Sequence, residues 1–405
     1  MNDILQGLRV IESSAFIAAP YAGMTLAQMG AEVIRVDQIG GGLDYRRWPV
    51  TREGASLYWA GLNKAKRSVC LDLRTPEGRE LLAALVTASG DGGGVFLTNL
   101  PAAPPVDYET LRARRGDLIM MAISGSRDGA TAVDYTVNAA AGFPLVTGPA
   151  GHDGPVNHVL PAWDLLTGLN AALAIIAAER HRKATGQGQL MRLALADVAF
   201  ATAGNLGYIA DAQVNGAERL RLGNEIYGTF GRDFATADGE RVMVVAFTVK
   251  QWDAIGKATG CGPALARLES ELKRDFRKES DRYEARAAIA AVIEPWFRAR
   301  TLAEVRRALD ANGACWGPYQ SFKGLVANDP RCSPANPIFA EVEQPGIGRY
   351  LMPGSPVDFG AAERRPTRPA PVLGADTDAV LSSVLGLTQR RIGELHDRKI
   401  VAGPQ

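Results

Sequence analysis

The sequence has little of what marks secreted, metal-binding or membrane-spanning proteins. Its 405 residues include only four cysteines, which are widely spaced and form no CxxC pair. We therefore expect reduced thiols in a cytoplasmic protein, with neither a disulfide framework nor a metal site. The first residues, MNDILQGLRVIESS, lack the basic and apolar regions of a signal peptide. The most apolar run, LLTGLNAALAIIAAE, is shorter than the roughly 20 residues that cross a bilayer, so no membrane partner is expected.

The chain also lacks an excess of either charge. Its 45 Lys and Arg residues balance 44 Asp and Glu residues, and the formal net charge is +1. The protein as a whole would not attract nucleic acid or an anionic membrane, so no nucleic acid is expected as a partner. Any anionic ligand must instead be held by a local cluster of cations.

The first 125 residues alternate short apolar runs with helical segments. The runs at 8–14, 31–37, 68–73, 94–99 and 118–125 are typical of buried strands, and the segments 20–30, 75–88 and 108–116 are typical of helices. Strand–helix–strand units of this length predict right-handed crossovers in a parallel sheet. These first 125 residues therefore predict a doubly wound α/β domain.

The remainder of the chain changes pattern twice. Residues 164–212 are predicted to be helical, whereas 227–247 alternate in polarity around a hairpin turn at Asp238–Gly239. The tail is rich in proline and predicts an extended strap that returns to the first domain. We predict a large α/β domain at 1–212, a small α+β domain at 225–330, and a C-terminal strap with a helix at 337–405.

The loop after the first strand lacks the glycines of a dinucleotide site. Asp37 ends the second strand, where an acidic residue commonly binds a ribose. A pyrophosphate needs a G-x-G-x-x-G turn so that the backbone can approach it, but the loop here reads ESSAFIAAP. Hydride transfer with NAD is therefore disfavoured.

Cations gather in two nearby segments of the first domain, residues 44–49 and 62–72, which together we call the basic run. The basic run contains Asn63 and five cations: Arg46, Arg47, Lys64, Lys66 and Arg67. A charged stretch of this kind is usually a solvated turn. Lysine and arginine also hold phosphates through charge-assisted hydrogen bonds, so the stretch is a candidate site for nucleotide phosphates. Composition alone favours the solvated turn.

Asp164 stands between Trp163 and a long apolar helix. One interpretation is a helix N-cap, whose carboxylate accepts the free backbone N–H groups of the first turn. The other is a nucleophile that the partial positive charge of the helix N-terminus keeps ionised. The two roles are compatible, although an aspartate before a helix is far more often an N-cap.

Four segments carry a resemblance to a known family. They are GLRVIESSAFIAAPYAGMTLAQMGAEVIRVD, LNKAKRSVCLDLRTPEGRELL, WDLLTGLNAALAIIAAERHRKATGQGQ, and PGSPVDFG with PAPVLGADTDAVLSSVLGL. Over essentially the whole chain, the sequence resembles the family III (CaiB/BaiF-type) CoA-transferases. The resemblance implies a Rossmann-like doubly wound large domain plus a smaller α+β domain, in a ring-shaped chain interlocked in a homodimer. The active site would lie at the domain and subunit interface.

The resemblance also implies roles for single residues. Asp164 falls on the catalytic aspartate of the family. Ala18, Lys66 and Asn99 fall on positions that line the CoA site. The mechanism implied is covalent catalysis, in which the aspartate becomes joined first to the acyl group and then to the sulfur of CoA.

The sequence departs from the family pattern in the CoA site. Formyl-CoA transferases carry Val-Gln in the first loop and an arginine after the second strand, whereas this chain has Phe16-Ile17 and Gln38. Polar contacts to CoA must then come from elsewhere. We expect Arg46, Arg47 or Lys64 to supply them, with Arg47 and Lys64 as the preferred candidates.

Within the family, the segments WAGLNKAKRS, GNEIYGTFGRDF and EQPGIGRYLMPGSP resemble members that move CoA between the two carboxyls of one acid. The implied reaction is CoA transfer between C1 and C4 of mesaconate through an aspartyl-CoA thioester. Coenzyme A would be part of the substrate, and no tightly bound cofactor is expected. The alternatives are an intermolecular transferase that uses a separate carboxylic acid, and a protein that kept the fold but lost catalysis.

The family also contains α-methylacyl-CoA racemases, which place a histidine directly before an aspartate. In this chain Val133 precedes Asp134. A racemase uses two bases to remove a proton from an α-carbon and return it on the other side. This chain lacks the histidine that would be the second base, so a racemase is disfavoured.

An isomerase must retain free mesaconate between the two halves of the reaction. Candidates for an apolar wall around the methyl group are Phe16, Ile17 and Trp163. Candidate cations for the carboxylate that is not reacting are Arg47, Arg127, His158 and Arg232. Backbone N–H groups near Gly125 or Gly142 are candidate oxyanion donors.

Overall fold

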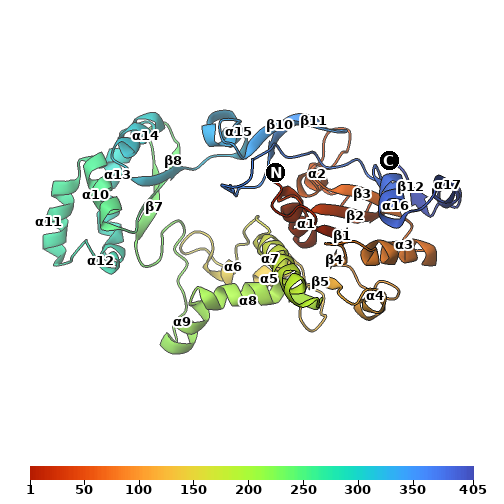
Figure 1. Ribbon diagram of the computed structural model, residues 1–405. Coiled ribbons are helices and arrows are strands. Elements are labelled where there is room, and N and C mark those ends of the chain that lie inside the picture. The colour runs from red at the N-terminus through yellow and green to blue at the C-terminus, as the bar shows by residue number, and fades with distance from the viewer. The chain divides into compact units, whose positions relative to one another are not determined.

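The computed structural model describes residues 1–405, and their contacts divide them into two compact units (Figure 1). The first unit comprises residues 1–141, 159–210 and 330–405, and the second comprises 142–158 and 211–329. Residues 142–158 therefore lie outside the unit that contains most of the large domain expected at 1–212. Arg221 in the second unit donates to the backbone carbonyl of Leu145 at 3.0 Å, so this Gly/Pro-rich segment is held by contacts from its own unit.

The first unit contains most of the regular structure. Its strands are β1 (Arg9–Ser13), β2 (Glu32–Gln38), β3 (Arg67–Leu71), β4 (Val95–Thr98), β5 (Ile119–Ser124), β6 (Leu190–Ala194), β10 (Phe339–Gln344), β11 (Gly348–Pro353) and β12 (Val401–Ala402). Its helices are α1 (Ala18–Gln28), α2 (Leu57–Leu62), α3 (Pro76–Thr87), α4 (Tyr108–Arg114), α5 (Asp134–Ala140), α7 (Ala162–Thr185), α8 (Leu195–Asn205), α16 (Thr377–Leu385) and α17 (Gln389–Asp397). Helix α9 (Tyr208–Asn215) spans the boundary between the units, and β10 and β11 form a separate antiparallel pair.

Seven strands form one sheet in the order β12-β3-β2-β1-β4-β5-β6. Strands β1 to β6 are parallel, and the short β12 lies at one edge, antiparallel to β3. β1 lies between β2 and β4, with Val10 in register with Val33 on one side and Val95 on the other. The order of the strands reverses beside β1, and ligands of doubly wound sheets bind at the carboxyl ends of the strands at such a point. The predicted α/β sheet is confirmed.

Helices cover both faces of this sheet. On one face, Ile11, Ile34 and Phe96 join an apolar core with residues of α3, α4, α16 and α17. Side chains alternate along a strand, so Glu12 points to the other face. There it meets Gly23 of α1, where an added Cβ atom would stand 1.8 Å from the carboxylate of Glu12. Helix α1 packs in turn on α7, so only glycine allows α1 to lie this close to the sheet.

One strand differs from the sequence-based prediction. Residues 164–212 are predicted to be helical apart from a break at 185–189, but Leu190–Ala194 form β6, which pairs with β5 at the edge of the sheet. Its sequence, LMRLA, contains good helix formers, and α8 begins at the next residue. Pairing with β5 outweighs this local preference.

The second unit is built on a small antiparallel sheet in the order β7-β8-β9. Its elements are α6 (Phe143–Val146), β7 (Phe230–Ala235), β8 (Arg241–Ala246), α10 (Val249–Thr259), α11 (Gly262–Leu272), α12 (Glu279–Glu284), α13 (Arg286–Arg298), α14 (Leu302–Ala311), β9 (Cys315–Pro318) and α15 (Phe322–Asn328). The hairpin predicted around Gly239 is confirmed as β7–β8. Phe230, Val244, Ile289 and Phe297 belong to the core between this sheet and its helices.

Helix α7 is long and apolar enough to span a membrane by length and composition alone. Its residues Ala171, Ala172 and Ile175 are buried. At Gly168 the backbone carbonyl of Ala18 comes within 2.7 Å of the position that a Cβ atom would take. This close packing on α1 is typical of a core helix in a globular unit.

Candidate active site

The loop after β1 is held by side chains from neighbouring parts of the sheet. Asn99, directly after β4, accepts the N–H of Ala15 at 2.9 Å and donates to the carbonyl of Ala15 at 2.7 Å. Asp44, after β2, accepts the N–H of Phe16 at 3.1 Å. Phe16 has a φ of 67°, a conformation that costs about 1–2 kcal/mol for residues other than glycine. These bonds therefore fix a strained loop at the carboxyl end of β1.

A buried network of charges lies next to this loop. The guanidinium of Arg35, which is fully buried, donates to Asp37 at 2.8 Å and to Asp44 at 3.0 Å. The ammonium of Lys66 lies 2.9 and 2.8 Å from the two carboxylate oxygens of Glu12. Because Asp44 also holds the loop after β1, the network ties the loop to the interior of the sheet.

The two lysines expected to bind CoA are buried and already paired. Lys66 donates to Glu12, to Asn63 and to a backbone carbonyl, each at 2.9 Å, and these bonds use all three of its N–H groups. Lys64 donates to the carbonyl of Pro353 at 2.9 Å. Burial lowers the pKa of both ammonium groups to about 8. The lysines of the basic run are thus not in a solvated turn, and in this structure they serve the protein interior.

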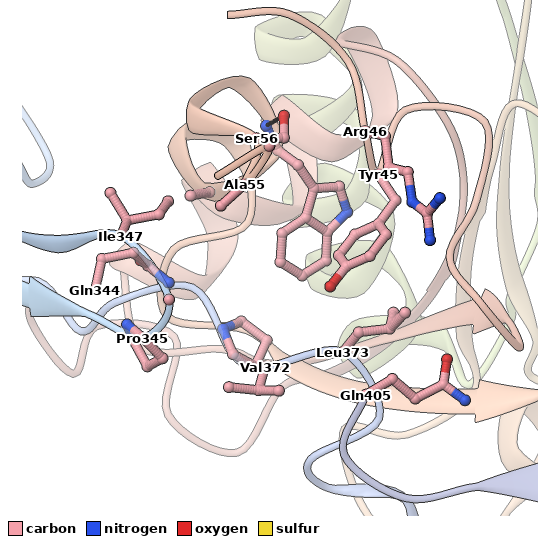
Figure 2. Close-up of a pocket in the computed structure, with 15 residues that line it drawn as sticks. Tyr45, Arg46, Ala55, Ser56, Gln344, Pro345, Ile347, Val372, Leu373 and Gln405 are labelled. Atoms are coloured by element: carbon pink, nitrogen blue, oxygen red, sulfur yellow. Dashed lines mark hydrogen bonds between the residues drawn. The ribbon is translucent and has the colours of Figure 1, made fainter. Parts of the chain in front are cut away.

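Two further cations of the basic run have other surroundings. Arg67 pairs with Glu32 at 2.7 Å. Arg46 lines a cavity of about 210 Å³ with Tyr45, Trp59 and the β10–β11 turn (Figure 2). Neither Asp164 nor any residue expected to bind CoA lines this cavity.

Arg47 differs from the other cations of the basic run because its guanidinium lies against two aromatic rings and no carboxylate of the chain lies within ion-pair distance of it. Its guanidinium carbon lies 5.4 Å from the ring centre of Phe16 and 5.5 Å from that of Tyr58. Both distances are within the range of a cation–π contact. Arg47 is exposed, so two aromatic rings position a cation that remains accessible to an anion.

Asp164 is the third residue of α7 and does not cap it. The helix begins at Ala162 and has no capping side chain at Pro161. Instead, Asp134 of α5 accepts the N–H groups of Trp163 and Asp164 at 2.8 and 3.1 Å. The predicted N-cap role of Asp164 is therefore wrong, because a carboxylate from another helix occupies that place.

The surroundings of Asp164 bring its titration close to neutral pH. Burial, together with the negative charge of Asp134, raises the pKa of its carboxyl to about 7, and the guanidinium of Arg47 opposes the rise. The expectation that the helix N-terminus keeps Asp164 ionised is thus not met, since its free N–H groups bind Asp134. At pH 7 about half of the molecules would carry the carboxylate. A half-buried acid that titrates near neutral pH is a candidate for chemistry.

The predicted residues of the first loop lie close to α7, whereas Trp163 belongs to the core. Ala18 is the first residue of α1 and Ile17 precedes it, and both are buried. Trp163 is only 4% exposed, and its indole N–H reaches Asn138 at 3.2 Å. Its proposed place in an apolar substrate wall is therefore not supported. Phe16, which is 38% exposed, remains a candidate.

The other candidates are dispersed. Arg127 is exposed and pairs with Asp197 at 2.6 Å. His158, Arg232 and Gly142 belong to the second unit, where Arg232 lies 3.5 Å from Glu225. Gly125 approaches the backbone of Ala132 so closely that a Cβ atom would stand 2.2 Å from its carbonyl oxygen. The structure thus brings Phe16 and Arg47 together in one unit with Asp164, but not Arg232 or His158.

Two residues near Asp164 are missed by sequence reasoning. Asp134 is noted only as a departure from the racemases, although it caps α7. Tyr58 supports Arg47, and its hydroxyl is buried without a hydrogen-bond partner. Burial raises the pKa of this hydroxyl, and the charge of Asp164 is among the smaller causes. In the sequence, only the nearness of Tyr58 to Arg47 could have pointed to the contact between them.

Comparisons with known proteins agree with the observed fold. A family model described as "CoA-transferase family III" matches residues 5–377, and the chain belongs to this family. The 2-methylfumaryl-CoA isomerase of Chloroflexus aurantiacus is 56% identical over 405 residues, which cover 100% of this chain and 99% of that protein. The resemblance drawn from the sequence is confirmed.

Two other relatives bear on the reaction and on the fold. The succinyl-CoA:mesaconate CoA-transferase of Haloarcula marismortui is 30% identical, over 91% of this chain and 93% of that protein. The crystal structure of a CAIB/BAIF family protein from Brucella suis matches with a TM-score of 0.77 and 26% identity, over 95% of this chain and 100% of that chain. The expected α/β fold is therefore also that of a solved member.

Proposed function

We propose that this chain catalyses intramolecular CoA transfer between the C1 and C4 carboxyls of mesaconate, which converts 2-methylfumaryl-CoA into 3-methylfumaryl-CoA. The observation that carries the proposal is the 56% identity, over the full chain, to the 2-methylfumaryl-CoA isomerase of Chloroflexus aurantiacus. Coenzyme A takes part as one half of the substrate, and the reaction uses no tightly bound cofactor.

In the proposed reaction Asp164 is the nucleophile. Its carboxylate attacks the C1 carbonyl of the thioester, which forms a mixed anhydride and expels CoA as the thiolate. The thiolate attacks the aspartyl carbonyl, which gives an aspartyl-CoA thioester and free mesaconate. Mesaconate then turns, its C4 carboxylate attacks the aspartyl thioester, and the expelled thiolate attacks the C4 carbonyl. The last step restores the carboxylate of Asp164, so no proton is gained or lost overall.

The surroundings of Asp164 support this role. Two hydrogen bonds to Asp134 hold the backbone at Asp164, so the nucleophile projects from a fixed point of the helix. A pKa of about 7 leaves a large share of carboxylate at physiological pH. Because this carboxylate is half-buried, it is less strongly solvated than an ordinary surface aspartate and reacts more readily once ionised.

We further propose that the loop after β1 receives the thioester end of CoA. Ala18 opens α1 without a capping side chain, and Asn99 fixes the loop beside it through two hydrogen bonds. Lys66 can contact CoA only by giving up a present partner, and Lys64 is buried. We therefore assign them the shaping of this loop rather than contact with CoA.

The proposed assembly is a cytoplasmic homodimer of interlocked ring-shaped chains. Membership of CoA-transferase family III supports the homodimer. The packing of the apolar helix α7 inside its own unit supports the cytoplasmic location. Sedimentation equilibrium of the purified protein checks the assembly: the proposal expects a dimer at micromolar concentration, and a monomer would contradict it.

Incubation with mesaconyl-C1-CoA tests the proposed reaction. Chromatography with mass spectrometry should show conversion to the C4 thioester without incorporation of isotopically labelled free mesaconate. If no C4 thioester forms, the proposed function is wrong.

A second candidate is an intermolecular transfer of CoA to a separate carboxylic acid. The 30% identity to the succinyl-CoA:mesaconate CoA-transferase of Haloarcula marismortui favours it. In the same experiment, free exchange of labelled mesaconate into the product would support this candidate over the isomerase. An Asp164→Ala protein as active as the wild type would instead exclude both mechanisms.

A further inference from the structure

Arg47 is positioned without the use of its hydrogen-bond donors. The rings of Phe16 and Tyr58 lie 5.4 and 5.5 Å from its guanidinium carbon. Contacts of this kind fix the plane of the guanidinium but leave its N–H groups unbonded. These groups have the geometry for two parallel hydrogen bonds to a carboxylate.

The guanidinium of Arg47 lies beside the start of α7. Phe16 precedes Ala18 by two residues, and the carbonyl oxygen of Ala18 comes within 2.7 Å of a Cβ position at Gly168. Gly168 lies about one helical turn after Asp164. The charge of Arg47 also opposes the rise in the pKa of Asp164. The packing and the electrostatics therefore both bring Arg47 to the neighbourhood of the nucleophile.

A dicarboxylate substrate needs a cation at this place. Asp164 lies next to the buried carboxylate of Asp134, which is only 3% exposed. A second negative group of the substrate would be repelled by these two acids. Of the other cations in the first unit considered for this role, Arg127 pairs with Asp197. Arg47 has no such partner.

We propose that Arg47 binds the substrate carboxylate that is not reacting. This inference rests on the proposed function, and it names the residue that makes the reaction intramolecular. In the first half of the reaction Arg47 holds the C4 carboxylate while Asp164 attacks C1. After the aspartyl-CoA thioester has formed, mesaconate turns and Arg47 holds the C1 carboxylate while C4 attacks. The guanidinium forms no covalent bond in either step.

The test compares Arg47→Gln and Arg47→Lys with Arg52→Gln, a matched control. Arg52 is an exposed arginine from the same loop region, so its replacement removes the same charge. Each protein receives mesaconyl-C1-CoA together with labelled free mesaconate, and formation of the C4 thioester and uptake of label are followed. Each also receives tiglyl-CoA, in which a methyl group replaces the C4 carboxylate, and intact-protein mass spectrometry follows aspartyl-CoA formation. Thermal unfolding confirms that all variants are folded.

The wild type and Arg52→Gln should isomerise mesaconyl-C1-CoA at similar rates. Arg47→Gln should lower kcat/KM about 100-fold, as expected for loss of a charge-assisted bond, and should incorporate labelled mesaconate because the free acid escapes. Arg47→Lys should fall between them, because lysine keeps the charge without the planar fork. With tiglyl-CoA, the wild type and Arg47→Gln should form the aspartyl thioester equally fast.

Two results would overturn the inference while the proposed function stands. One is a wild type that isomerises while Arg47→Gln behaves as Arg52→Gln. The other is an Arg47→Gln protein that loses equal activity toward both thioesters, since the carboxylate would then be irrelevant. A wild type that forms no C4 thioester would instead refute the proposed function, and this inference with it.

Discussion

The basic run contains two kinds of cation that the sequence does not distinguish. Lys66 is buried, and each of its N–H groups is bound to an oxygen of the protein. Arg47, also in this run, is exposed and has only aromatic neighbours. The difference follows from the fold: Lys66 directly precedes β3 and donates to a backbone carbonyl of α1, whereas Arg47 lies in the connection before α2. Cations that lie close together in the sequence therefore need not bind the same ligand.

The two cations should also affect the protein in different ways. A buried ion pair is strongly unfavourable when one partner is lost, because the remaining charge has no water around it. An exposed cation contributes little to folding. Lys66 should therefore matter for stability and Arg47 for the reaction, and the following predictions test this division.

Replacement of Lys66 by methionine should have the largest effect on stability. It leaves the carboxylate of Glu12 without the ammonium that lies 2.8 Å away, and we expect a loss of about 3–5 kcal/mol. Urea denaturation followed by circular dichroism measures the loss. The double variant Glu12→Gln/Lys66→Met should recover much of it, because no buried charge is then unpaired. A single variant as stable as the wild type would contradict the structural role of Lys66.

Replacement of Asp164 by asparagine should stabilise the protein, but only at high pH. The pKa of Asp164 is about 7 in the folded protein and about 3.9 when unfolded. Between these values the folded state binds more protons than the unfolded state, so this group lowers stability as the pH rises from about 4 to 7. Asp164→Asn should thus gain on the order of 2 kcal/mol at pH 8. Urea denaturation at pH 4 should show no such gain, and equal gains at both pH values would exclude the raised pKa.

Replacement of Asp134 by asparagine should shift the pH dependence of activity. The amide oxygen can still accept the N–H groups of Trp163 and Asp164, but the negative charge that raises the pKa of Asp164 is gone. The acidic limb of the kcat/KM profile should therefore move to lower pH by about one unit. A rate that falls equally at every pH would assign Asp134 a purely structural role.

Replacing a surface ion pair should have the smallest effect on stability, and it provides a reference for the other variants. Arg390 and Glu394 form an exposed pair on α17 at 3.2 Å. Their separate replacement by glutamine should change stability by about 0.5 kcal/mol or less. A loss as large as that of Lys66→Met would show that burial does not explain the difference between the two regions.

Much of the fold can be read from the sequence, because buried parallel strands appear as continuous apolar runs. β1, β2, β3, β4 and β5 are all found in this way. β6 is not, since LMRLA has the composition of a helix and only its pairing with β5 makes it a strand. The sequence also does not show that residues 142–158 group with the second unit, because their contacts include Arg221, far along the chain.

The candidate site is less predictable, because its properties depend on partners that are distant in sequence. The position of Asp164 follows from the family resemblance. Its pKa does not, since it depends on Asp134, which lies thirty residues earlier in the chain. Nor does the local sequence show that Lys66 pairs with Glu12 across the sheet. Local charge reveals which residues can ionise, whereas burial and pairing decide what they do.

Covalent trapping of the reacting side chain tests the central claim most directly. The protein is mixed with mesaconyl-C1-CoA at pH 8, quenched with hydroxylamine and digested, and the modified peptide is identified by mass spectrometry. The account predicts a hydroxamate on Asp164 that forms only in the presence of the thioester and is absent from Asp164→Asn. An active protein that carries the hydroxamate on another residue, or on none, would contradict it.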